Sequence, residues 1–405
     1  MLDDFGQRIR DIILSEMDLS RELSDEEICD LIGSVVSREA RDRPMTIKDR
    51  AELERTIFNS LRKLDVLQEL VDDRDVTEIM VNGPNDIFYE KAGRIQRFKG
   101  HFSSEEKLED VIQQIVGRHN RVVNQASPIV DTRLSDGSRV NIVLNPISIG
   151  GSAVSIRKFP EHPMSMERLV EIEALSPEVA RLLQILTQAK YNIFISGGTG
   201  SGKTTFLNAL SQYIPDDERI ITIEDSAELQ LLGAKNIVRL ETRNANTDGV
   251  TPITIRDLIR TALRMRPDRI IVGECRGAEA LDMLQAMNTG HDGSLSTGHA
   301  NSPHDIISRI ETMVLQGQDF PLNAIRQQIA SGIDIIVQLG RLRDKSRRVL
   351  EISEVDGFMD GEIVLHTLYC FEETAVLDSG RIQGFLKKAG TLCHTDKLMA
   401  AGLSV

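Results

Sequence analysis

A glycine-rich stretch that ends in lysine and threonine carries the clearest chemistry in this sequence. Residues 197–204 read GGTGSGKT and match the G-x-x-x-x-G-K-[ST] pattern of a phosphate-binding loop, or P-loop. Glycines let backbone N–H groups surround phosphate oxygens, and a lysine ammonium can reach the β- and γ-phosphates of a nucleotide. The apolar run YNIFIS precedes the loop and TFLNALSQYI follows it, so we expect a strand before the loop and a helix after it.

We therefore expect this loop to bind ATP together with Mg²⁺. The Lys203 ammonium would offset phosphate charge, and the Thr204 hydroxyl would ligate the Mg²⁺ ion. A P-loop alone does not define what the nucleotide drives, because kinases, GTPases, helicases and motor ATPases share it. The predicted nucleotide-binding residues are Gly197, Gly198, Thr199, Gly200, Ser201, Gly202, Lys203, Thr204 and Thr205.

Carboxylates follow two further segments that have the pattern of buried strands. RIITIE ends at Glu224, with Asp225 and Glu228 just beyond it, and residues 269–272 lead into Gly273 and Glu274. In open α/β sheets, ligands bind at the carboxyl ends of the strands. Gly273 stands where many P-loop enzymes have aspartate, so we expect Glu274 to act through water, and Glu224 to contact Mg²⁺ through water. The pattern leaves open which glutamate is the general base.

The composition limits the classes of partner. The chain has 48 Lys and Arg against 62 Asp and Glu, a net charge of −14, with 4% aromatic residues and no tryptophan. Such a chain is a poor general binder of nucleic acid or anionic lipid, and we expect no direct contact with nucleic acid. No apolar run approaches the roughly 18 residues that span a bilayer, and the N-terminus lacks a signal peptide, so we expect a cytoplasmic protein. The four cysteines lack metal-ligand spacing.

The pattern of apolar residues changes along the chain and indicates several domains. Residues 1–65 have helical periodicity, with a possible N-cap at Ser24, and residues 66–160 alternate strands and tight turns around one helix. The stretch 161–177 holds two prolines and is interpreted as a linker. From 178 to 405, helices and strands alternate, which predicts an α/β domain with a largely parallel sheet, C-terminal strands and a helical tail.

Four motifs together resemble those of the secretion and pilus ATPase superfamily, from about residue 60 to about 370. They are the P-loop (Walker A), ITIEDSAEL (Asp box), IIVGECRG (Walker B) and GSLSTGHANS (His box, with His299). Within the superfamily, VTEIMVNGP, DTRLSDGSRVN and AMNTGHDGSLSTGHAN are most similar to the Tad/Flp pilus ATPases of the CpaF (TadA) type. The type II enzymes commonly carry a tetracysteine zinc insert, and its absence here disfavours that branch.

This resemblance implies a RecA-like ATPase domain, a PAS-like N-terminal domain behind a helical extension, and a homohexamer. It implies that Arg139 and Arg157 of one subunit, with Arg133 as a further candidate, close over the phosphates bound by a neighbour. His299 would couple nucleotide state to domain position, near the γ-phosphate. The implied function is a motor at the inner face of the cell membrane that assembles, and in some relatives retracts, a Tad/Flp pilus through inner-membrane platform proteins.

Three alternatives remain at this stage. One is a type IV secretion or conjugation ATPase, which shares the same motifs. Another is a RecA-like nucleic-acid translocase, which would use the stripe Arg256, Arg260 and Arg264; we interpret that stripe as a solvated or inter-subunit helix face. A small-molecule kinase would need an arginine-rich lid that the sequence lacks. We also expect a ring because the P-loop domain offers few arginines of its own near the phosphates.

Overall fold

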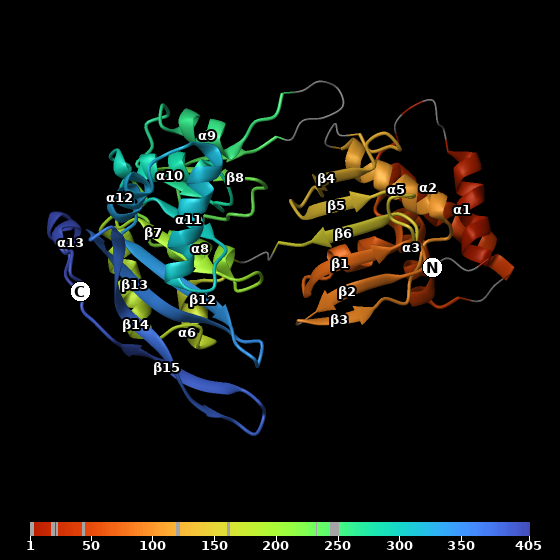
Figure 1. The fold of residues 1–405 in the computed structure, drawn as a ribbon. Helices are drawn as coiled ribbons and strands as arrows, with labels where there is room; N and C mark the ends of the chain where they lie inside the picture. The colour runs from red at the N-terminus through yellow and green to blue at the C-terminus, as the bar shows by residue number, and fades with distance from the viewer. Residues whose placement is uncertain are drawn as a thin grey trace. The chain divides into compact units, whose positions relative to one another are not determined.

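The computed structural model divides the chain into two compact units, Met1–Glu161 and His162–Val405, which are described separately (Figure 1). Among the residues that the structure describes, no helix is both long enough and apolar enough to cross a lipid bilayer. The described residues are 4–17, 21, 23–42, 45–91, 93–118, 122–159, 163–231, 233–243 and 251–405.

The first unit begins with three helices that share a small apolar core. They are α1 (Asp4–Glu16), α2 (Asp25–Glu39) and α3 (Ile47–Arg62), and their inward faces are lined by isoleucine and valine. Ser24 caps α2 as predicted, because its side chain accepts the Glu27 N–H while the Glu27 carboxylate accepts the Ser24 N–H.

An antiparallel sheet forms the rest of the first unit, with strand order β3-β2-β1-β6-β5-β4. Apolar side chains on one face of the sheet pack against α4 and α5. The predicted strands and the hairpin at Asp136–Gly137 are confirmed, and Gly137 has the positive φ (89°) that such a turn requires. The elements are α4 (Gln68–Asp72), β1 (Val76–Asn82), β2 (Ile87–Lys91), β3 (Arg94–Arg97), α5 (Glu105–Gly117), β4 (Ile129–Arg133), β5 (Arg139–Val143) and β6 (Ala153–Arg157).

The second unit is a sheet covered by helices on both faces, with strand order β15-β14-β13-β12-β7-β11-β10-β8-β9. Strands β12, β7, β11, β10, β8 and β9 run parallel to one another, and β13, β14 and β15 extend the sheet from β12 in antiparallel fashion. Strand β7 is buried on both sides, since Ile193 and Ile195 face the core under α7 and α8, while Phe194 faces the core under α9 to α12.

The first part of the second unit supplies the P-loop strand and its parallel neighbours. Its elements are α6 (Met166–Glu171), α7 (Pro177–Gln188), β7 (Ile193–Gly197), α8 (Lys203–Ser211), β8 (Arg219–Glu224), β9 (Asn236–Glu241), α9 (Ile255–Ala262) and β10 (Arg269–Val272). The rest of the unit contains α10 (Glu279–Asn288), β11 (Leu295–Gly298), α11 (Pro303–Gly317), α12 (Leu322–Gly332), β12 (Ile335–Arg341), β13 (Arg347–Met359), β14 (Glu362–Val376), β15 (Ile382–Lys388) and α13 (Asp396–Ala401).

The stretch interpreted from the sequence as a linker differs in the structure. Residues 163–177 contain α6, and Met166, Leu169 and Leu175 are buried in the core beneath α7 and α8. The two prolines suggested an open connection, but the apolar residues between them have enough surface to pack on the sheet.

A buried ion pair joins several segments at the edge of the sheet where the strands begin. Arg269, the first residue of β10, is fully buried, and its guanidinium pairs with both oxygens of Glu218 through Nε and NH2. Its NH1 donates to the Thr187 carbonyl oxygen at 2.7 Å. A Cβ added to Gly293 would lie 2.5 Å from NH1, so the glycine leaves room for the guanidinium. The pair thus connects α7, β8, β10 and the loop before β11.

We expect Arg269→Met to destabilise the protein strongly, because it removes both guanidinium hydrogen bonds from the buried Glu218 carboxylate and leaves it only Lys190 Nζ, at 3.7 Å. Removing one partner of a buried pair costs about 3–5 kcal/mol, which corresponds to a fall of roughly 10 °C in thermal midpoint. Circular dichroism of the full chain during heating measures this fall. Arg168→Ala, which removes an exposed arginine paired with Glu171, is the control and should leave the midpoint nearly unchanged. Equal midpoints for the two variants would contradict the role given to Arg269.

Candidate functional site

The P-loop connects the end of β7 to the start of α8, as expected from the sequence. Gly200 and Gly202 have positive φ values of 71° and 95°, a conformation that side chains rarely adopt. A Cβ on Gly197 would lie 2.7 Å from the carbonyl oxygen of Leu339, so the start of the loop is packed against β12. The loop therefore has the open, glycine-determined shape that phosphate binding requires.

The Lys203 side chain is folded back into the loop. Lys203 is 8% exposed, and its Nζ donates to the carbonyl oxygens of Gly197 at 3.0 Å and Gly198 at 3.1 Å. Nζ also lies 3.1 Å from Nδ1 of His299. Burial lowers the pKa of Lys203 from its ordinary value. The ammonium is thus shared between the loop and the His box.

His299 lies between the P-loop lysine and the Walker B glutamate. It follows β11, which pairs with β7 on one side and β10 on the other, so this position at the ligand-binding edge agrees with the sequence-based expectation. Its Nε2 is 2.7 Å from Oε1 of Glu274. A lysine ammonium can only donate and a carboxylate can only accept, so Nδ1 is the acceptor and Nε2 carries the proton. Burial and the nearby Lys203 cation lower the pKa of His299, which favours this neutral imidazole.

Glu224 and Gly273 are complementary residues on neighbouring strands. Glu224 ends β8 and is 4% exposed, and its Oε2 accepts the backbone N–H groups of Glu228 at 2.7 Å and Leu229 at 2.9 Å. A Cβ on Gly273 would lie 2.9 Å from Cγ of Glu224. The side chain of Glu224 therefore fills the space that any side chain at 273 would need. This explains why glycine stands where the sequence pattern led us to look for aspartate.

Two arginines of the same unit lie at the site and were missed by sequence reasoning. Arg276 NH2 is 2.5 Å from Oε2 of Glu274, and this hydrogen bond raises the pKa of Arg276. Arg347, the first residue of β13, donates from Nε to the carbonyl oxygen of Gly200 at 2.9 Å. Arg276 is two residues from Glu274 in the Walker B segment, which was a usable signal. From the sequence we expected few arginines of the P-loop domain near the phosphates. The positions of Arg276 and Arg347 show that this expectation was wrong.

The arginines expected to act in trans form one row across the sheet of the first unit. Arg133 of β4 is opposite Arg139 of β5, which is opposite Arg157 of β6, which in turn is opposite Glu78 of β1. Arg157 also donates from Nε to Glu78 at 2.8 Å. Since residues opposite each other in a sheet share a face, the three guanidinium groups extend from the same side.

The arginine stripe that begins on α9 is partly engaged in contacts within its own unit, so it is less exposed to solvent or to a partner than its spacing suggested. Arg256 and Arg260 both donate from Nε to Asp282 of α10, at 2.7 and 2.9 Å, and the Asp282 side chain is almost fully buried. Arg256 therefore holds α9 against α10, while Arg260 stays 57% exposed despite its bond to Asp282 and Arg264, just beyond α9, is exposed. The interpretation as a solvated face thus holds for Arg260 and Arg264 and not for Arg256.

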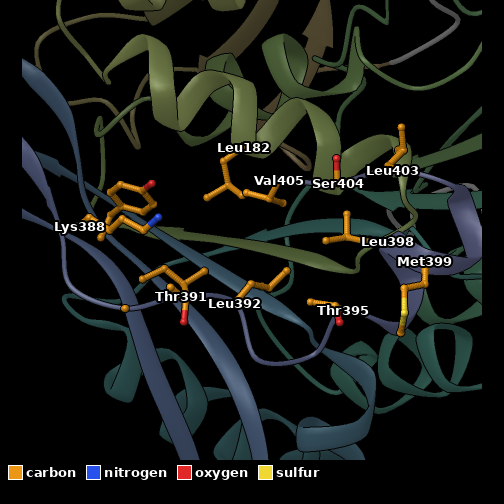
Figure 2. A pocket seen from close by; sticks show the side chains of 13 residues that line it. Leu182, Lys388, Thr391, Leu392, Thr395, Leu398, Met399, Leu403, Ser404 and Val405 are labelled. Carbon is orange, nitrogen blue, oxygen red and sulfur yellow. The ribbon is translucent and has the colours of Figure 1, made fainter.

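A pocket of about 390 Å³ lies beneath the C-terminal segment, apart from these residues (Figure 2). Its lining is mostly aliphatic and includes Leu182 of α7, Leu398 of α13 and Leu403. None of the predicted site residues lines it.

Comparison with known proteins identifies the family of this chain. Residues 60–383 match the profile of the family described as "Type II/IV secretion system protein". Conjugal transfer protein TrbB of Rhizobium radiobacter is 32% identical, over 77% of this chain and 93% of the relative. Type IV secretion system protein PtlH of Bordetella pertussis is 33% identical, over 73% of this chain and 94% of the relative. The chain belongs to the type II/IV secretion system ATPase family.

Solved structures agree with this at the level of the fold. The pilus retraction motor PilT with bound ADP matches with a TM-score of 0.55 and 23% identity, over 76% of this chain and 82% of that one. The ATPase DotB of Legionella pneumophila matches with a TM-score of 0.53 and 22% identity, over 72% and 80%.

We expect Gly273→Ala to impair ATP hydrolysis while the protein stays folded, because the new methyl group must displace Glu224. Small displacements of groups at a reacting centre cost up to about 100-fold, and we expect at least a 10-fold fall in kcat. A coupled-enzyme ATPase assay measures it. Gly117→Ala is the control, since a Cβ at Gly117 meets nothing within 4 Å. Equal rates for the two variants would show that the fit between Gly273 and Glu224 has no catalytic role.

Proposed function

We propose that this chain is a Mg²⁺-dependent ATP hydrolase that works as a homohexameric motor for a Tad/Flp-type pilus. The observation that carries the hydrolase is the contact of Lys203, His299 and Glu274, which brings three motifs from distant parts of the sequence together: His299 Nδ1 lies 3.1 Å from Lys203 Nζ, and His299 Nε2 lies 2.7 Å from Glu274 Oε1. The proposed setting is cytoplasmic, at the inner face of the membrane, where inner-membrane platform proteins bind the ring.

The residues of the P-loop fit a nucleoside triphosphate. Gly200 and Gly202 keep the loop open, and Lys203 is placed to exchange its carbonyl partners for phosphate oxygens. The hydroxyl of Thr204 and the carboxylate of Glu224, at the end of β8, are oxygen donors of the kind that Mg²⁺ prefers. Bound Mg²⁺ would neutralise charge that develops on the β- and γ-phosphates.

The two glutamates have different surroundings, which supports different roles. Glu224 is buried, and one of its oxygens is held by two backbone N–H groups, so we assign it to holding metal-bound water. Glu274 has a side chain 19% exposed and is held only by other side chains. A general base must reach the attacking water and take its proton, so we assign that role to Glu274.

His299 is proposed to report whether phosphate is bound. Its Nδ1 accepts from Lys203, and its Nε2 lies 2.7 Å from Oε1 of Glu274. A phosphate that draws Lys203 away removes the donor to Nδ1 and changes how the imidazole holds the glutamate. Occupancy of the P-loop is thereby transmitted to the proposed general base.

The motor assignment extends beyond the active site. The first unit is proposed to be the PAS-like domain of the family, and its row of Arg133, Arg139 and Arg157 to contact phosphates bound by the neighbouring subunit. The segments that resemble Tad/Flp pilus ATPases support the pilus assignment. No direct contact with nucleic acid is proposed, since the chain is acidic and Arg256 and Arg260 are already paired.

A second candidate is a conjugation or type IV secretion ATPase, which the names of TrbB and PtlH favour. Deletion of the gene in its own host separates the two assignments. Loss of surface pili, restored by the wild-type gene, supports the pilus motor. Normal pili with loss of DNA transfer or protein secretion would favour the second candidate.

We expect Lys203→Ala and Arg157→Ala to be inactive alone and to recover activity when mixed. Each mixed ring contains sites where one subunit supplies Lys203 and its neighbour supplies Arg157. Random mixing of equal amounts makes about a quarter of the sites complete, so about a quarter of the wild-type rate is expected. Mixing Arg157→Ala with the Lys203→Ala/Arg157→Ala double variant is the control and should give none. Full wild-type activity in a verified monomer would refute the ring.

We expect His299→Ala to lower kcat far more than it changes KM, because the imidazole relays occupancy rather than binds the nucleotide. A loss confined to kcat marks an interaction that matters after binding. Steady-state kinetics over a range of ATP concentrations, with a fluorescent nucleotide to measure affinity, gives both quantities. Abolished nucleotide binding in this variant, or stoichiometric zinc in the wild type that the substitution removes, would rule out the relay.

A further inference from the structure

Arg276 lies at the centre of the site, and none of the roles expected for the four motifs accounts for this arginine. It lies in the turn between β10 and α10, and its NH2 is 2.5 Å from Oε2 of Glu274. Its NH1 is 3.8 Å from Oδ2 of Asp225, which follows β8. One guanidinium therefore lies between a carboxylate of the Walker B segment and a carboxylate of the Asp box.

The backbone around Arg276 is fixed independently of its side chain. The Glu279 carboxylate accepts the backbone N–H of Arg276 at 2.6 Å and that of Gly277 at 2.8 Å. The Arg276 side chain itself is 59% exposed, so its place is set by the two carboxylates rather than by packing. Its stem starts from a rigid turn, and its charged end is held by Glu274.

The two oxygens of Glu274 have different neighbours. Arg276 donates a hydrogen bond to Oε2, while His299 Nε2 lies 2.7 Å from Oε1, a contact whose geometry does not make a hydrogen bond. The hydrogen bond from Arg276 is therefore the one that fixes the plane of the carboxylate. Without Arg276, the carboxylate loses this hydrogen bond and is free to rotate. A planar guanidinium suits this task, because its fixed fork holds a carboxylate in a defined plane.

We propose that Arg276 is a positioning residue that orients Glu274 for activation of the attacking water. This inference rests on the proposed function, since it assigns to Arg276 the orientation of the proposed general base. Arg276 acts through Glu274 and needs no contact with the nucleotide. Asp225 provides a second anchor that keeps the guanidinium between the two strand ends.

The test is a double-mutant cycle in the full-length protein with ATP and Mg²⁺. We expect Arg276→Gln to lower kcat about 10- to 100-fold, as loss of a supporting partner does, with KM within about 3-fold of wild type. Arg276→Lys should recover part of kcat, because it keeps the charge without the planar fork. In single-turnover assays with Glu274→Gln, adding Arg276→Gln should change the rate less than about 3-fold, because residues that act as a unit are not additive. Arg181→Gln, which removes an exposed arginine of α7, is the control.

The outcomes separate this inference from the proposed function. Additive losses in the double variant would mean that Arg276 acts on the nucleotide directly, and would overturn the positioning role. Wild-type kcat in Arg276→Gln would overturn it as well, while leaving the hydrolase intact. If the wild-type protein does not hydrolyse ATP, the proposed function fails, and this inference fails with it. If Glu274→Gln hydrolyses ATP normally, the general-base role of Glu274 and this inference fail, while the hydrolase stands.

Discussion

The site depends on the order of four neighbouring parallel strands, β7-β11-β10-β8. Because β11 lies between the P-loop strand and the Walker B strand, His299 is placed between Lys203 and Glu274. Because β8 lies beside β10, Glu224 fills the space next to Gly273. Any other order would separate these groups by at least one strand, about 4.8 Å, and break these direct contacts. At the other edge of the sheet, where β8 and β10 begin, the buried pair of Arg269 and Glu218 holds these two strands together.

Charges of both signs lie close together at the site. Lys203 and Arg276 are positive, Glu274 is negative, and the neutral imidazole of His299 lies between Lys203 and Glu274. A buried ammonium without partners would be costly, and the carbonyl oxygens of Gly197 and Gly198 offset that cost. The P-loop is therefore kept ready for an anion, with its lysine held by weak neutral acceptors that phosphate oxygens can replace.

Local features of this chain were readable from the sequence, and contacts between distant segments were not. The strand before the P-loop, the N-cap at Ser24 and the hairpin at Gly137 follow from short patterns, and the structure confirms them. The contact of Arg347 with Gly200 joins residues 147 positions apart, and no local pattern encodes it. Gly273 looked like a lost metal ligand, because the side chain that replaces it comes from another strand. The helix α6 was hidden by two flanking prolines, whose local signal outweighed the apolar residues between them.

The position of β7 in the middle of its sheet has a consequence for synthesis of the chain on the ribosome. Strand β7 pairs with β11 and β12, which follow it by about a hundred residues or more, and Arg347 contacts the P-loop from later still. A nascent chain that ends soon after α8 has the complete P-loop sequence but neither neighbour of β7. The phosphate-binding loop therefore gains its packed form only when most of the second unit has emerged, and truncated chains that carry the motif lack the site.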